Sequence, residues 1–149
     1  MEKVDVAIIG GGPGGATLAN ILASRGISTV LVERQKDFSK EFRGEGLMPS
    51  GNEVLEQIGF NLDDVDYRKV EEINLFYKGE LEANPEIDFL KRGELRWVSQ
   101  PQLLEKLIEK ASSFDNFIFY RGYKALDLIY NEDRVDGVLI ANGDREVSI

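Results

Sequence analysis

Hydrophobic and polar positions follow two different periods over residues 4–33. An apolar run, Val6 to Ile9, leads straight into a glycine-rich stretch, a helix-like pattern follows over residues 16–25, and a second apolar run covers Thr29 to Val32. Short apolar runs next to turn residues are typical of buried strands, whereas apolar positions that recur about every 3.6 residues indicate a helix. The pattern predicts a strand, a glycine turn, a helix and a second strand.

The glycine turn has a spacing that is typical of dinucleotide-binding units. Gly10, Gly12 and Gly15 fit G-x-G-x-x-G, and Glu33 closes the second strand 18 residues after the last of these glycines. In such units the first glycine permits a sharp turn, the second lets the backbone approach a pyrophosphate, and the third lets the helix pack close to the sheet. Pro13 suits the first helical position, where the N–H it lacks would have no partner.

The start of the predicted helix is a candidate anion site that needs no lysine. N–H groups in the first turn of a helix point at the ligand, and the helix dipole favours negative charge there. Glu33 is expected to accept hydrogen bonds from ribose hydroxyls and to repel a 2′-phosphate, which argues against NADP as the ligand of this half. The stretch predicts a nucleotide-binding unit, with NAD and FAD both open at this point.

The rest of the chain predicts further helices and strands, and a meander at its end. In order, the expected elements are a polar loop over 34–45, a short helix over 52–58 ended by Gly59, strands over 73–77, 87–90 and 95–98, a helix over 101–112, a third parallel strand over 117–120, and antiparallel strands over 125–130, 135–141 and 146–149. Residues 61–69 are acidic and show no periodicity. Because the last run stops in mid-strand, the chain is expected to be part of something longer.

Composition narrows the partners and the chemistry. The 149 residues carry a net charge of −9, which argues against nucleic acid or an anionic membrane as a partner. No apolar stretch approaches the roughly 20 residues of a membrane span, and no basic-then-apolar leader is present, so a cytoplasmic location is expected. Without Cys or His the chain lacks a thiolate, a Ser-His pair and a usual zinc site. We expect no metal, and a bound cofactor to supply any difficult chemistry.

The motifs, taken together, resemble the N-terminal part of flavoprotein monooxygenases of the para-hydroxybenzoate hydroxylase type, which are aromatic-ring hydroxylases. Residues 5–15 resemble their FAD fingerprint, and residues 32–34 the end of their second strand. The remaining similarity lies in residues 42–49 with Leu55 and Ile58-Gly59, in residues 99–104, in residues 115–117 and in residues 134–138. The shared order and spacing of these motifs carry the resemblance, which covers essentially the whole chain.

The resemblance implies FAD as the cofactor, with NADPH or NADH as the reductant, O₂ as the oxidant and a small-molecule substrate. The implied cofactor-binding residues are Gly10, Gly12, Pro13, Gly14 and Gly15 for the pyrophosphate, Glu33 for the adenosine ribose, Arg34 near adenine, Arg43 for the pyrophosphate or ribityl chain, Gln100 for the ribityl hydroxyls, and Ala125 for adenine through its backbone. No catalytic residue and no oligomeric state follow from it.

The implied fold is α/β, a Rossmann-like FAD-binding domain of the glutathione-reductase type with a three-stranded β-meander and a parallel sheet that is incomplete in this chain. Residues 1–70 and 99–149 would form part of the FAD-binding domain, and residues 71–98 would be a segment of a substrate domain that is otherwise missing. The family's Asp-Gly motif beyond the meander and its later Gly-Asp motif are absent here. The chain alone is therefore expected to be inactive.

Two other readings stay open. An FAD-dependent isoprenoid reductase of the geranylgeranyl type or a flavin-dependent halogenase would share the same opening residues in outline, and residues 44–49 are similar to the halogenase loop. A non-catalytic NAD-binding module is the third possibility, although the long loop and the meander argue against a simple NAD dehydrogenase.

Overall fold

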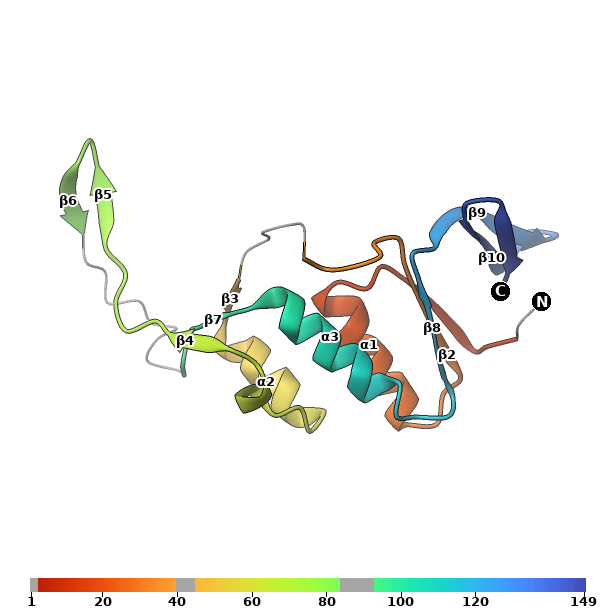
Figure 1. The fold of residues 1–149 in the computed structure, drawn as a ribbon, viewed down its shortest axis with the longest axis horizontal. Coiled ribbons are helices and arrows are strands. Elements are labelled where there is room, and N and C mark those ends of the chain that lie inside the picture. The colour runs from red at the N-terminus through yellow and green to blue at the C-terminus, as the bar shows by residue number, and fades with distance from the viewer. Residues whose placement is uncertain (1–2, 40–44, 84–92) are drawn as a thin grey trace. The chain divides into compact units, whose positions relative to one another are not determined.

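The computed structural model describes residues 3–39, 45–83 and 93–149 (Figure 1). The chain divides into two compact units, one formed by Met1–Glu41 with Leu104–Ile149 and the other by Phe42–Leu103. Arg43 and the strand expected over 87–90 lie outside the described residues. Each unit has its own sheets and is described by itself.

A three-stranded parallel sheet forms the centre of the first unit. Its order is β1 (Val6–Ile9), β2 (Thr29–Glu33) and β8 (Phe117–Arg121), and α1 (Pro13–Ser24) connects the first two strands. Every residue of β2 is buried, as expected for a central parallel strand that is covered on both faces. These observations confirm the predicted strand–turn–helix–strand order and the third parallel strand.

Helix α3 (Gln100–Ala111) contributes residues 104–111 to this unit. Its apolar positions recur at helical spacing and are all at most 5% exposed; they are Leu103, Leu104, Leu107, Ile108 and Ala111. The buried Asn20 amide of α1 donates hydrogen bonds to the Ala16 carbonyl, at 2.9 Å, and to the Leu107 carbonyl, at 2.8 Å. This side chain therefore ties α1 to α3.

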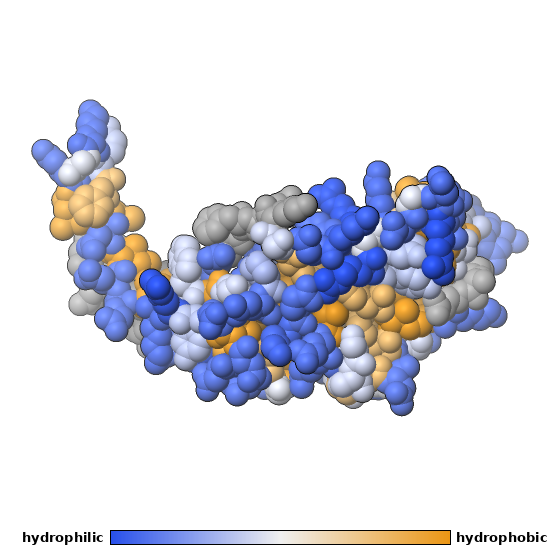
Figure 2. All heavy atoms as spheres, viewed as in Figure 1, coloured by the Kyte–Doolittle hydropathy of each residue, from blue (hydrophilic) through white to orange (hydrophobic). Residues whose placement is uncertain are grey.

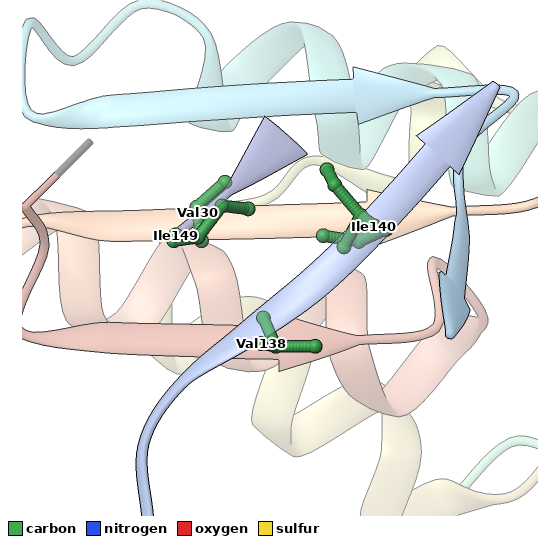
Figure 3. Close-up of a cluster of buried hydrophobic side chains, with 5 residues drawn as sticks. Val30, Val138, Ile140 and Ile149 are labelled. Carbon is green, nitrogen blue, oxygen red and sulfur yellow. The ribbon is translucent and has the colours of Figure 1, made fainter. Parts of the chain in front are cut away.

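The meander covers one face of the parallel sheet. It consists of β9 (Lys124–Asn131), β10 (Arg134–Asn142) and β11 (Arg145–Ser148), paired antiparallel in the order β11-β10-β9. Val30 and Val32 of β2 meet Val138, Ile140 and Ile149 in one buried cluster, and β10 runs obliquely across the parallel strands (Figure 3). The predicted three-stranded meander is confirmed.

The described residues of the second unit form short strands, the helix α2 and a 3-10 turn, and they include the start of α3. Its antiparallel sheet has the order β3 (Gly46–Leu47), β7 (Arg96–Val98) and β4 (Tyr67–Lys69), and its other elements are α2 (Pro49–Gln57), the 3-10 turn η1 (Leu62–Asp64) and the hairpin of β5 (Leu75–Tyr77) with β6 (Glu80–Ala83). Gly59 follows α2 with φ +67°, in agreement with its predicted role in ending that helix. Residues 62–69, for which no element was expected, thus contain a turn and a strand.

The hairpin exposes large apolar side chains (Figure 2). Leu75, Phe76, Tyr77 and Leu81 are between 53% and 66% exposed. A two-stranded ribbon is marginally stable in water unless further strands or a helix pack on it. Among the helices of the described ranges, none combines the length and the apolar content needed to cross a membrane.

We predict that Ile140→Ala destabilises the chain by about 2–5 kcal/mol, because Ile140 is fully buried between the meander and the sheet. The measurement is urea unfolding followed by circular dichroism. Val135→Ala is the matched control, since Val135 lies on the same strand but is 50% exposed, and it should cost less than about 1 kcal/mol. Equal losses in the two variants would contradict the placement of the core.

Candidate nucleotide-binding site

The turn between β1 and α1 bends at Gly10, directly after the last residue of the strand. Gly10 has φ +107°, a conformation that residues with a side chain rarely adopt. Its N–H still donates to the Val32 carbonyl, at 2.8 Å, so the pairing of β1 with β2 continues for one residue into the turn. The sharp turn that was expected at this glycine is present.

The approach of α1 to the turn depends on Gly15. A Cβ atom at residue 15 would lie 2.0 Å from the Gly10 carbonyl oxygen and 3.4 Å from Cγ2 of Ile8. The first of these contacts is with backbone, which has no rotamer to change. The helix can therefore lie this close to the turn only because residue 15 has no side chain.

The start of α1 leaves room for a ligand. The helix begins at Pro13 with Gly12 as its N-cap, and a Cβ atom at Gly12 or at Gly14 would have no atom within 4 Å. N–H groups in the first turn of a helix have no intrahelical acceptor, and Pro13 has no N–H to offer. This arrangement, at the N-terminus of a 12-residue helix, can hold a phosphate or diphosphate by backbone N–H groups.

Glu33 lies beside the same turn. Its side chain is mostly buried, with the residue only 8% exposed. One carboxylate oxygen accepts the Gly11 N–H, and the other accepts the Gln35 N–H, both at 2.7 Å. The expected acid is therefore next to the glycine turn, although sequence reasoning did not anticipate its bond to Gly11.

The other predicted site residues fall in three places. Arg34 is exposed and follows β2, and Ala125 on β9 pairs with Ile140 and packs against the buried cluster. Both belong to the unit that contains the glycine turn. Gln100 is the first residue of α3 and is half-buried in the other unit, while Arg43 is not described.

Arg121 is a charged residue near this site that sequence reasoning missed. It pairs with Glu33 in the register of β2 and β8, and its guanidinium forms two hydrogen bonds with the Glu105 carboxylate, at 2.7 and 2.5 Å. The same guanidinium lies 5.1 Å from the centre of the Phe38 ring. The hydrogen bonds with Glu105 raise the pKa of Arg121, and the Glu33 charge raises that pKa further. Arg121 thus links α3 to the loop after β2.

These features define a nucleotide-binding α/β domain: parallel strands, a glycine turn, an open helix N-terminus and an acid at the end of the second strand. Residues 3–148 match the family described as FAD binding domain, and the chain belongs to that family. The relatives include 6-methylpretetramide 4-monooxygenase of Streptomyces rimosus, which is 31% identical over 144 residues. That alignment covers 93% of this chain and 34% of the relative, so the chain spans about a third of the relative's length.

Solved structures share the fold. The Pseudomonas aeruginosa protein pqsL, described as a probable FAD-dependent monooxygenase, is 25% identical with a TM-score of 0.75, over 97% of this chain and 40% of its own. A geranylgeranyl bacteriochlorophyll reductase-like protein of Thermoplasma acidophilum is 23% identical with a TM-score of 0.77, over 99% of this chain and 37% of its own. The myxobacterial chondrochloren halogenase CndH is 22% identical with a TM-score of 0.74, over 99% and 35%. At these last two identities the likeness concerns the fold alone.

We predict opposite effects of the same substitution at two neighbouring glycines of α1. Gly15→Ala should destabilise the chain by about 1–3 kcal/mol, because its Cβ would collide with the Gly10 carbonyl. Gly14→Ala adds a Cβ into open space within a helix and should be neutral or stabilise by about 0.5–1 kcal/mol. Thermal and urea unfolding measure both changes, and an unaltered stability of Gly15→Ala would show that α1 does not approach the turn this closely.

Proposed function

We propose that this chain is the FAD-binding portion of an NAD(P)H-dependent flavin monooxygenase that hydroxylates a small organic, aromatic substrate with O₂. The observation that carries the proposal is the side-chain-free space at Gly12, in front of the open N-terminus of α1, in a chain that matches an FAD-binding family over nearly its whole length. The monooxygenase among its relatives supports the reaction type.

In the proposed site, backbone groups bind some parts of the cofactor and side chains bind the others. N–H groups of Gly12, Gly14 and Gly15 would hold the diphosphate, and Gly10 and Pro13 would shape the turn that presents them. The other proposed contacts are Glu33 to the adenosine ribose, Arg34 and the Ala125 backbone to adenine, Arg43 to the diphosphate or ribityl chain, and Gln100 to the ribityl hydroxyls. FAD, when bound, supplies the redox chemistry: it takes electrons from NADPH or NADH and passes them to O₂.

We also propose the finer architecture of a Rossmann-like domain of the glutathione-reductase type whose parallel sheet is completed by further polypeptide. Ile9 on β1, an edge strand of the three-stranded sheet, is 53% exposed, which supports a sheet that continues past this strand. Residues 1–70 and 99–149 would belong to the FAD-binding domain, and 71–98 to a substrate domain. The exposed apolar side chains of the β5–β6 hairpin support that second assignment.

A second candidate keeps the cofactor and changes the reaction. The similar folds of a reductase-like protein and a halogenase favour an FAD-dependent isoprenoid reductase or a flavin-dependent halogenase as the alternatives. A non-catalytic NAD-binding module is the third, and the absorbance of bound flavin separates it from the others.

The first test is FAD binding by the chain itself, followed by the quenching of flavin fluorescence. We predict that Gly12→Val raises the dissociation constant at least about tenfold, or about 1.4 kcal/mol, because the new side chain fills the space that the diphosphate needs. The unfolding free energy should fall by about 1 kcal/mol, because valine is a poorer N-cap residue than glycine. Ser24→Val, the same new side chain at the exposed far end of α1, should leave the affinity unchanged. A parent chain that binds no FAD would refute the proposal.

The second test addresses the reaction in a protein that contains this chain and has the length of its relatives. We expect the purified protein to be yellow and to oxidise NADPH or NADH faster when an aromatic substrate is added, with one oxygen atom of O₂ found in the product. Mass spectrometry after reaction in ¹⁸O₂ measures this incorporation. Chlorination of the substrate, or reduction of a double bond without oxygen incorporation, would favour the alternatives.

A further inference from the structure

The Glu33 carboxylate accepts hydrogen bonds from two backbone segments that are separate along the chain. Its Oε2 accepts the N–H of Gly11 in the glycine turn, and its Oε1 accepts the N–H of Gln35 in the loop after β2, each at 2.7 Å. The residue is only 8% exposed; the bond to Gly11 is buried, where water competes little with it, and the bond to Gln35 is partly buried. The carboxylate thus joins the two loops that border the nucleotide site.

The bond to Gly11 extends the pairing of β1 with β2. The backbone ladder ends where the Gly10 N–H meets the Val32 carbonyl, at 2.8 Å, and at the next residue a side chain replaces the backbone acceptor. A run of glycines has more conformational freedom than any other sequence, so a turn of this composition needs an external restraint to keep one shape. Glu33 provides that restraint.

Glu33 occupies the space in which a side chain at residue 11 would lie. A Cβ atom at residue 11 would lie 3.0 Å from Cβ, 3.2 Å from Cγ and 3.2 Å from Oε2 of Glu33. The middle glycine of Gly10-Gly11-Gly12 lies between the first two of the three motif glycines. It has its own requirement, because the Glu33 side chain packs directly on it.

We propose that Glu33 is a positioning residue, whose carboxylate holds the glycine turn and the loop after β2 in the shape that receives a diphosphate before any ligand is bound. This role rests on the proposed FAD-binding function and adds to the expected contact with ribose. The two roles are compatible, because an ionised carboxylate offers about four acceptor positions and the described residues donate to two of them.

Two substitutions disturb this restraint in different ways. Glu33→Gln keeps the size of the side chain but replaces one acceptor oxygen by an NH₂ donor, so only one of the two backbone N–H groups can keep its bond. Gly11→Ala keeps the carboxylate and displaces it, because its Cβ would lie 3.0 Å from that of Glu33. Glu105→Gln is the matched control, an acid-to-amide change on α3 at a side chain bonded to Arg121.

Backbone hydrogen exchange of the ligand-free chain gives the first readout, and it needs no FAD. For Glu33→Gln we expect the Gly11 or the Gln35 amide to exchange at least about tenfold faster, as expected when a hydrogen bond to a charged group is lost, and Glu105→Gln to leave both unchanged. Should Glu33→Gln fail to fold, Gly11→Ala is measured instead, with faster exchange expected at Gln35. Unaltered protection of both amides would overturn the proposal.

Inorganic pyrophosphate, which has no ribose, gives the second readout by calorimetry. If Glu33 positions the turn, Glu33→Gln weakens pyrophosphate binding at least about threefold as well as FAD binding. If Glu33 contacts ribose alone, FAD binding weakens while pyrophosphate affinity and amide protection stay at the parent values, which overturns the inference and leaves the proposed function standing. A parent chain that binds neither ligand but shows the exchange effect would refute the function and keep the restraint.

Discussion

The contact between α1 and the end of β1 is the constraint on which the nucleotide site depends. Residue 15 must be glycine because a Cβ there would lie 2.0 Å from the Gly10 carbonyl oxygen. This approach sets the first turn of the helix directly after the strand, so that its free N–H groups and the positive end of its dipole converge in front of Gly12. A longer connection would leave the same helix without a fixed position for an anion.

The register of the parallel sheet then decides which side chain stands beside that turn. Ile9 pairs with Val32, so the residues that follow them, Gly10 and Glu33, lie at the same end of the two strands. The buried cluster of Val30 and Val32 with the meander holds β2 in this register, because a slip of one residue would turn both valines away from the meander. Packing on one face of β2 thus controls the position of the acid at its end.

The sequence predicted the parts of this unit whose signals are local and long enough. Strand, glycine turn, helix and acid all lie within residues 4–33. The meander is predicted by short strand-like runs that are separated by turn residues. Strand β3, by contrast, has two residues, too few positions to show a period. The contacts of Arg121 were also beyond prediction, because Glu105 and Phe38 reach it from distant segments. The roles of Arg43, Gln100 and Ala125 rest on the resemblance and remain proposals.

Because the chain has a negative net charge, its site can attract an anion only through short-range interactions. A net charge of −9 and a carboxylate beside the turn both disfavour an incoming anion, so a long-range field cannot be the source of attraction. An anion is favoured here by the backbone N–H groups at the start of the helix, which point toward it. Their effect falls off within one turn of the helix. Such donors act only when their geometry is fixed, and the Glu33 carboxylate accepts the N–H of Gly11, directly before the N-cap of α1, at 2.7 Å. In the role proposed above, the acid would oppose a diphosphate by its charge and favour it by holding the shape of the turn.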